Sequence, residues 1–487
     1  MKCFKNLLTA GALALGLAFS AFGVSAAADD NLLYEMKETQ TITRGVTYDE
    51  ITRVTKNGWL YMYALTIDAN DDNVDLDVIK STEEYGYKES TLAISSENGV
   101  VAAVNGDYFG SGNPGSSMGQ VLSDGELEEA KNYYNGDANN YAGFFIDSDG
   151  VAFVDYLKTS VGFYNSNETI IELSGKNKYN DFSQPVYFDR QAITSTADLD
   201  KRNSNLTKTV VDTGVISYIS EPGETVEVPE EGYIIVMNNS TRESKIGYYS
   251  VGQAVSFVEN GTFVFRPAKS MSEISFGISG GGEILRNGET IAQGEIISPS
   301  GRNPRTCIGV SQDKSKIIIL CIDGRVKGIG ATSYECSEIM RELGAYDAIQ
   351  LDGGGSTTMV IKPQGEESLE VVNTPSDGAQ REVANAVGIN SVGTYTGLGF
   401  IEITTSADDN VLVKGLNYNL SYQAYDNLYN KMSLSSDSIS LSVEGVEGSF
   451  DGLSFTPSSE GVGKIIAETT LSDGTVVTGE ADIAVLS

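Results

Sequence analysis

Alternating apolar and polar positions dominate the sequence. Runs of this kind fill residues 40–80 and recur across 143–290, where turns rich in Gly, Asn and Asp separate them. Alternation with a period of two is the pattern of a strand that buries one face. The segment 32–39 departs from this pattern and predicts a weak helix. The sequence therefore predicts antiparallel sheets accompanied by few helices.

The clearest helical pattern begins at residue 332. Thr332 or Ser333 can serve as the N-cap, and Thr332 and Glu335 have the spacing of a capping box. Gly344 supplies the stop signal. Between these ends, apolar residues recur at the spacing of one helix face, at Cys336, Ile339, Met340 and Leu343.

Two shorter patterns flank this helix. Strand-like runs at 306–310 and 317–323 lie on either side of a polar turn and predict a β-hairpin. A buried strand at 348–351 follows the helix and ends in an acidic, glycine-rich loop at 352–357. A second buried run, 100–104, ends at the turn Asn-Gly-Asp.

The chain divides into predicted parts. Residues 1–28 combine two lysines, an apolar run and small residues, the pattern of a cleaved signal peptide, so we expect a secreted or cell-surface protein without stable membrane insertion after its removal. The composition changes near 393: residues 394–399 form a linker, and 400–487 contain only short strands and turns. We expect an α+β fold, with a largely antiparallel β domain and few helices over 29–393, followed by a small all-β sandwich.

Charge and composition narrow the chemistry. The 487 residues include 33 Lys and Arg against 67 Asp and Glu, a net charge of −34 that argues against binding nucleic acid. The chain has no histidine, which excludes Ser-His-Asp and Cys-His hydrolases and His-ligated zinc. Acid–base chemistry must then rest mainly on carboxylates. No cofactor is required, and any metal would be Ca or Mg held by oxygen ligands.

Three cysteines follow the predicted signal peptide, namely Cys307, Cys321 and Cys336. Their apolar neighbours favour buried free thiols. A Cys307–Cys321 disulfide across the hairpin is the alternative.

Two features suggest a site for an anionic ligand. The glycines of 352–357 allow several backbone N–H groups to point at one phosphate, although three glycines also occur in ordinary loops. Residues 301–341 hold seven basic against four acidic residues in an otherwise acidic chain. Arg302 and Arg305 flank a turn fixed by Pro304, and arginine suits bidentate phosphate binding.

Four carboxylates are candidates for catalysis: Asp107, Asp323, Glu335 and Asp352. A pair of carboxyl groups at suitable separation can act on a glycosidic bond. Glu335 has the alternative role of a helix cap, and Asp107 and Asp323 that of turn residues. Asp352, at the end of a buried strand, is the strongest candidate.

Six motifs then occur in order: Asn-Gly-Asp-Tyr-Phe at 105–109, Ser-Gly-Gly-Gly-Glu-Ile-Leu at 279–285, Arg-Asn-Pro-Arg-Thr-Cys-Ile-Gly-Val at 302–310, Ile-Asp-Gly-Arg at 322–325, Ala-Tyr-Asp-Ala-Ile-Gln-Leu-Asp-Gly-Gly-Gly-Ser-Thr-Thr at 345–358 and Val-Val-Asn-Thr-Pro-Ser-Asp-Gly at 371–378. Together they closely resemble the phosphodiester glycosidase family over residues 40–393. Residues 400–487 resemble bacterial immunoglobulin-like modules.

The resemblance implies an enzyme that releases a sugar from a sugar 1-phosphodiester of the N-acetylglucosamine type, in a phosphoglycan or cell-wall polymer. It implies catalytic roles for the four carboxylates named above. The positions that match the family's other polar motifs, and so are expected to bind substrate or phosphate, are Asn105, Arg302, Arg305, Gly353, Gly354, Gly355, Ser356 and Asn373. Two alternatives stay open: a non-catalytic surface module that binds anionic glycans, and an oxygen-ligated metal phosphodiesterase.

Overall fold

A computed structural model describes residues 32–487 except 84, 111, 113, 132–140, 166–169 and 292–299. The predicted signal peptide, 1–28, lies outside the described residues. The chain forms two compact units. The larger comprises Asp30–Pro363 and Glu367–Gly393, and the smaller includes Gln364–Glu366 and Thr394–Ser487. Strand pairing is antiparallel throughout the described residues except for β13 with β14 and β30 with β37, which confirms the expected, largely antiparallel α+β fold.

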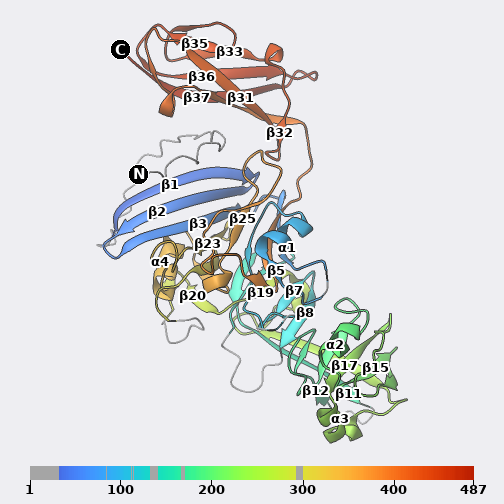
Figure 1. Ribbon diagram of the computed structural model, residues 1–487. Coiled ribbons are helices and arrows are strands. Elements are labelled where there is room, and N and C mark those ends of the chain that lie inside the picture. The colour runs from blue at the N-terminus through green and yellow to red at the C-terminus, as the bar shows by residue number, and fades with distance from the viewer. Residues whose placement is uncertain are drawn as a thin grey trace, which may run out of the picture. The chain divides into compact units, whose positions relative to one another are not determined.

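An eight-stranded sheet supports the larger unit (Figure 1). In spatial order its strands are β1 (Leu32–Thr43), β2 (Val46–Thr55), β3 (Gly58–Asp68), β23 (Lys316–Ile322), β22 (Arg305–Val310), β24 (Asp347–Gln350), β20 (Gly282–Arg286) and β21 (Glu289–Thr290). The helix predicted at 32–39 is wrong, because this segment lies in β1 and pairs with β2. The cross-strand ladder outweighs a weak local preference for helix.

The hairpin and the helix that follows it are confirmed. Strands β22 and β23 pair in antiparallel register, with Thr306 opposite Cys321 and Cys307 opposite Leu320. Helix α4 (Ser333–Glu342) begins at a capping box formed by Thr332 and Glu335. Its apolar face contributes to a cluster with the sheet, so the predicted face is the one that is buried.

The register also decides the state of the thiols. Cys321 lies in the apolar cluster on one side of the sheet, and Cys307 lies with Cys336 in the cluster on the other side. All three are buried and free, as their apolar neighbours favoured. The alternative Cys307–Cys321 disulfide is wrong because the two side chains point to opposite faces of the hairpin.

A five-stranded sheet packs against the large sheet through a shared core. Its spatial order is β26 (Glu370–Val371), β25 (Met359–Ile361), β6 (Ala102–Asn105), β28 (Ala386–Ser391) and β4 (Val74–Ile79). Helix α1 (Thr91–Asn98) precedes β6, and the short strands β5 (Glu89–Ser90) and β27 (Glu382–Val383) pair with each other. The sheet matters for function because β6 ends at Asn105 and β25 begins just after the 352–358 loop.

The rest of the larger unit consists of two sheets and two short helices, α2 (Ala197–Arg202) and α3 (Asn239–Ser244). The three-stranded sheet contains β12 (Ile170–Glu172), β11 (Leu157–Asn165) and β18 (Val255–Phe263). The ten-stranded sheet runs in the order β10 (Ala152–Asp155), β9 (Gly143–Asp147), β19 (Ile274–Ser279), β7 (Val121–Ser123), β8 (Glu126–Lys131), β13 (Gly175–Lys176), β14 (Val186–Asp189), β17 (Gly232–Asn238), β15 (Leu206–Asp212) and β16 (Val215–Ile219).

The smaller unit consists of two sheets that share one apolar core. One sheet contains β29 (Leu398–Thr405), β31 (Tyr418–Asp426), β35 (Ser454–Pro457), β34 (Gly448–Phe450) and β32 (Lys431–Met432). The other contains β30 (Val411–Val413), β37 (Val476–Leu486), β36 (Gly461–Thr470) and β33 (Ser440–Glu444). Its likeness to immunoglobulin modules stays a prediction.

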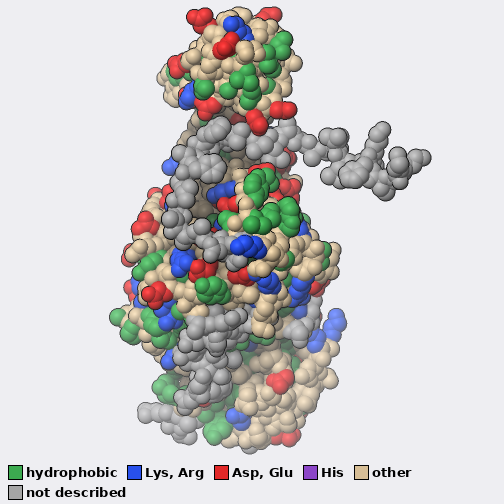
Figure 2. All heavy atoms as spheres, turned by 90° about the vertical axis from the view of Figure 1, so that its left-hand side faces the viewer, with side chains coloured by type: hydrophobic (Ala, Val, Ile, Leu, Met, Phe, Trp, Pro, Cys, Tyr) green, Lys and Arg blue, Asp and Glu red, His purple; other side chains and the backbone are tan. Residues whose placement is uncertain are grey.

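Acidic and basic side chains are interspersed on the face seen in Figure 2, so the net negative charge is not gathered in a single patch there. Among the described residues, no helix has the length and apolar character needed to span a bilayer.

Candidate active site

The site is assembled where β6 and β24 end. Asn105 is fully buried, and its Nδ2 donates a hydrogen bond to the carbonyl oxygen of Asp352 at 2.7 Å. Its Oδ1 accepts hydrogen bonds from Thr306 Oγ1 at 2.8 Å and from Thr358 N at 3.1 Å. The backbone N–H of Asp352 donates to Gly106 O at 3.0 Å. The Asn105 side chain therefore ties the turn that carries Asp107 to the loop that carries Asp352.

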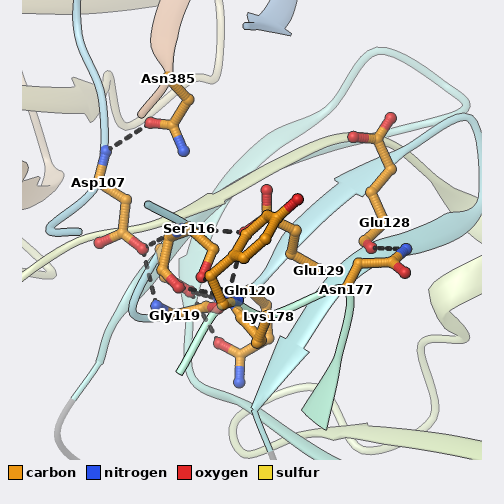
Figure 3. A network of polar contacts seen from close by, with 12 residues as sticks. Asp107, Ser116, Gly119, Gln120, Glu128, Glu129, Asn177, Lys178 and Asn385 are labelled. Atoms are coloured by element: carbon orange, nitrogen blue, oxygen red, sulfur yellow. Dashed lines mark hydrogen bonds and ion pairs between the residues drawn. The ribbon is translucent and has the colours of Figure 1, made fainter. Parts of the chain in front are cut away.

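Asp107 is buried beside this junction. Its Oδ2 accepts hydrogen bonds from the Ser117 hydroxyl and, at 2.8 Å, from the Gly119 N–H, and its Oδ1 accepts one from the Tyr108 N–H. Figure 3 shows Asp107 and Gly119 within this network. Burial raises the pKa of Asp107 to about 7, although these hydrogen bonds and the charge of Lys178 oppose the rise. A carboxyl group with a pKa near neutrality can serve as an acid or a base.

Asp323 directly follows β23 and is also buried. It accepts hydrogen bonds from Tyr63 Oη at 3.0 Å, Asn373 Nδ2 at 3.2 Å and Thr374 N at 2.9 Å. Burial raises its pKa, while these donors and the nearby ammonium of Lys327, 3.9 Å from Oδ2, lower it. Asp323 is thus a second buried carboxyl group held in place by hydrogen bonds.

Asp352 is the third carboxyl group whose pKa is raised. Burial raises its pKa, and hydrogen bonds from Ser356 and from the Gly353 N–H, together with the charge of Arg381, lower it. Arg381 also donates to Ser356 Oγ at 3.4 Å. Arg381 was not among the predicted site residues. Its only sequence signal is its place shortly after the 371–378 motif.

The glycine loop is tightly bound to its surroundings. The N–H groups of Gly353, Gly354, Ser356 and Thr357 donate to Asp352 Oδ1 or to carbonyl oxygens of the protein. Gly354 has φ +63°, and a Cβ there would lie 3.1 Å from the guanidinium of Arg325. A Cβ on Gly355 would lie 2.1 Å from Arg381 Nη2. The glycines therefore allow two guanidinium groups, those of Arg325 and Arg381, to approach the loop closely.

Asn373 links the loop to Asp323. Its Nδ2 donates to Asp323 Oδ1 and to Thr357 O at 3.0 Å, and its Oδ1 accepts from the Met359 N–H at 2.8 Å. Several buried polar atoms of the same region have no hydrogen-bond partner in the described part of the chain, namely Gln350 Nε2, Thr357 Oγ1, Thr358 Oγ1, Ser376 Oγ and Asn385 Nδ2. Buried polar groups are normally satisfied, so a ligand or water is expected near them.

Three further residues brace the neighbouring segments. Glu335 binds the backbone N–H of Thr332 at 2.8 Å in the capping box and forms an ion pair with Arg302. Arg302 also donates to Gly330 O at 2.9 Å. Arg305 is 2% exposed and donates to Ala331 O at 3.0 Å and to Gly301 O at 2.8 Å. The expected phosphate contacts of the two arginines stay predictions.

Three of the four predicted carboxylates, Asp107, Asp323 and Asp352, thus lie on segments that hydrogen bonds join around residues 352–358. Glu335 is engaged in its helix cap. Within the described residues, no group of three Cys, Asp or Glu side chains has the arrangement of a metal site, and a role for Ca or Mg stays a prediction. Buried carboxyl groups with raised pKa values beside guanidinium groups are suited to acid–base chemistry on an anionic substrate.

Comparison with known proteins finds a family match over part of the chain. Residues 205–390 match the model of the phosphodiester glycosidase family, which confirms over that segment the resemblance seen in the motifs. A sequence relative, the uncharacterised SPbeta prophage protein YomE of Bacillus subtilis strain 168, is 29% identical over 103 residues, 21% of this chain and 15% of that protein. The matched region is thus a small part of that relative.

Solved structures share the fold. A hypothetical protein from Synechocystis aligns with a TM-score of 0.59 at 19% identity, over 73% of this chain and 63% of that one. A candidate exported protein of Burkholderia pseudomallei K96243 aligns with a TM-score of 0.61 at 16% identity, over 74% and 97%. The catalytic domain of zebrafish N-acetylglucosamine-1-phosphodiester alpha-N-acetylglucosaminidase, auto-inhibited by its pro-peptide, aligns over 74% of this chain and 88% of that one, at 13% identity and a TM-score of 0.37.

Proposed function

We propose that this protein is an exported hydrolase that cleaves the glycosidic bond of sugar 1-phosphodiesters, of the N-acetylglucosamine type, in glycans or cell-wall polymers. One observation carries the proposal. Asp107, Asp323 and Asp352 are carboxyl groups whose pKa values are raised by burial, and their segments are joined by the side chains of Asn105 and Asn373. The family match over 205–390 supports the same chemistry.

In this proposal the carboxyl groups act at the anomeric carbon of the sugar. Either one carboxylate attacks that carbon and forms a glycosyl ester that water then hydrolyses, or one carboxylate takes a proton from a water molecule that attacks the carbon directly. In both routes the bond between the anomeric carbon and the phosphate oxygen breaks, and the phosphomonoester leaves. Asp352 is our first choice for this role because it opens the glycine loop. The departing phosphomonoester carries its own negative charge, so it needs little protonation as it leaves. Arg325 and Arg381, beside the loop, supply charge-assisted hydrogen bonds to the phosphate oxygens.

Product analysis tests this function. The mature chain, 29–487, is incubated with the methyl diester of N-acetylglucosamine 1-phosphate, and the products are identified by mass spectrometry. We expect free N-acetylglucosamine and methyl phosphate from the wild type and none from Asp352→Asn. Asp437→Asn, an exposed aspartate of the smaller unit, serves as the control and is expected to retain activity.

The same experiment separates the two alternatives. An oxygen-ligated metal phosphodiesterase would release N-acetylglucosamine 1-phosphate and methanol, and a chelator would stop it. A non-catalytic glycan-binding module would bind sugar 1-phosphodiesters without releasing either product. Either result would overturn the glycosidase proposal.

A further inference from the structure

A buried ion pair lies behind the segment that holds Asp107. Lys178, two residues beyond the end of β13, is 7% exposed, and Glu129 of β8 is 3% exposed. The Nζ of Lys178 lies 3.3 Å from Glu129 Oε2 and donates to the carbonyl oxygens of Ser117 and, at 2.6 Å, Gly119. An ammonium group has three N–H donors, so these three acceptors satisfy all of them.

Residues 117–119 connect this ion pair to Asp107. The Ser117 N–H donates to Glu129 Oε2 at 2.9 Å, and its hydroxyl donates to Asp107 Oδ2. The Gly119 N–H donates to the same oxygen at 2.8 Å. Residues 117–119 therefore accept hydrogen bonds from Lys178 at their carbonyl groups and donate hydrogen bonds to the Asp107 carboxylate. Figure 3 shows Asp107, Gly119, Glu129 and Lys178 in one network of polar contacts.

We propose that Lys178 is a positioning residue for Asp107, because its ammonium group fixes residues 117–119 in the conformation that aims two donors at the Asp107 carboxylate. The inference rests on the proposed function, in which Asp107 is one of the working acids. It extends the site to residues 129 and 178, which lie outside the segment 205–390 matched by the family model.

The surrounding charges make Lys178 sensitive to substitution. Glu129 is shared with Lys80, whose Nζ lies 3.0 Å from Glu129 Oε1 and 2.9 Å from Glu128 Oε2. The charges of the two lysines and the two glutamates balance, and Asp107 adds a negative charge when it ionises. Loss of Lys178 would leave the carbonyl groups of Ser117 and Gly119 without their lysine donor and would remove one of the two cations paired with Glu129. It would also remove the positive charge that favours ionised Asp107.

The chain provides a matched control two residues away. Lys176 is similarly buried, with 12% of its side chain exposed against 8% for Lys178. Its Nζ lies 3.1 Å from Glu259 and 3.7 Å from Asp189, so it binds a different pair of carboxylates. Asn177 between the two lysines has φ +53°, which interrupts the regular alternation of a strand. Lys176→Met removes a buried charge without touching residues 117–119.

The experiment compares Lys178→Met, Lys178→Arg and Lys176→Met in the mature chain. For Lys178→Met we expect kcat to fall by about 10- to 100-fold with a smaller change in KM, because a small displacement of a catalytic group is costly. We also expect the limb of the pH–rate profile that reports Asp107 to move to higher pH. Lys178→Arg, which keeps the cation, should recover part of kcat and of the pH shift, and Lys176→Met should change neither.

The inference would be overturned if Lys178→Met had a lower melting temperature but a pH–rate profile whose Asp107 limb had not moved. A lysine with a purely structural role would give that result. If the methionine variant does not fold, Lys178→Gln replaces it, since glutamine keeps N–H donors and loses the charge. If the wild type cleaves no sugar phosphodiester, the proposed function fails on its own. The pKa of Asp107 is then followed by infrared titration against Asp107→Asn, and an equal midpoint in wild type and Lys178→Met would overturn the inference.

Discussion

Asn105 and Asp352 are 247 positions apart in the chain, and a hydrogen bond of 2.7 Å joins the side chain of the first to the backbone of the second. Asn105 ends the central strand of the five-stranded sheet, and Asp352 follows a strand of the eight-stranded sheet. The two sheets pack over a shared core, so this bond spans their ends. The position of Asp352 therefore depends on the packing of the two sheets as well as on its own loop.

Replacement of Asn105 by alanine should destabilise the protein. The change leaves Thr306 Oγ1, the Thr358 N–H and the Asp352 carbonyl oxygen without their partner, and each buried unsatisfied group costs roughly 1–3 kcal/mol. We expect the free energy of unfolding, measured by urea denaturation, to fall by about 3 kcal/mol or more. Asn105→Asp is the comparison, because it keeps an acceptor for the two donors and replaces the N–H that binds the Asp352 carbonyl oxygen with a second oxygen. A loss below about 1 kcal/mol in the alanine variant would show that the junction does not depend on Asn105.

The stability of the protein should depend on the ionisation of Asp107. Burial raises the pKa of Asp107 from its ordinary value of 3.8 to about 7, so ionisation is easier in the unfolded chain than in the folded one. The contribution of Asp107 is then fully present below its unfolded pKa and is lost as the pH rises to about 7. We expect the free energy of unfolding of wild type, relative to Asp107→Asn, to decrease between about pH 4 and pH 7 and to level off above. A difference that does not change with pH would contradict the raised pKa.

Arg381 and Arg302 should differ in their effect on the substrate. The guanidinium of Arg381 lies against Gly355 and Ser356 at the glycine loop and is paired there with Asp377, whereas Arg302 is paired with Glu335 at the helix cap. A charge-assisted hydrogen bond contributes roughly 1.5–3 kcal/mol, so Arg381→Ala should raise KM by on the order of 10-fold or more. Arg302→Ala should lower the melting temperature with a smaller effect on KM. If steady-state kinetics showed the larger rise in KM for Arg302→Ala, the phosphate would bind at Arg302, as the sequence predicted.

Tryptophan fluorescence offers a direct measure of ligand binding near Asp323. Trp59 is the only tryptophan in the chain, it is 52% exposed, and its ring stacks beside Tyr61 at 6.2 Å. The carbonyl oxygen of Tyr61 accepts a hydrogen bond from the Asp323 N–H at 3.0 Å. Addition of a sugar 1-phosphodiester to inactive Asp352→Asn should therefore change the emission in a saturable way. Binding seen by calorimetry without any change in emission would place the ligand away from this edge of the site.

The sequence by itself predicted the local elements and their chemistry. The capping box and apolar spacing predicted α4, the turn between two apolar runs predicted the hairpin of β22 and β23, and period-two alternation predicted a largely antiparallel fold. Each of these depends on residues close together in the chain, where spacing alone determines which side chains share a face. The motifs indicated Asp107, Asp323 and Asp352 for the same reason: each lies one or two residues beyond the end of a strand.

Only the tertiary structure decided what each of these residues contacts. Residues 32–39 form a strand because β2 lies beside them, and Cys307 and Cys321 cannot pair because the register places them on opposite faces. Arg381 reaches the glycine loop, and Lys178 reaches residues 117–119, through contacts between segments far apart in sequence. A raised pKa arises from burial, and burial is created only when separate sheets pack together.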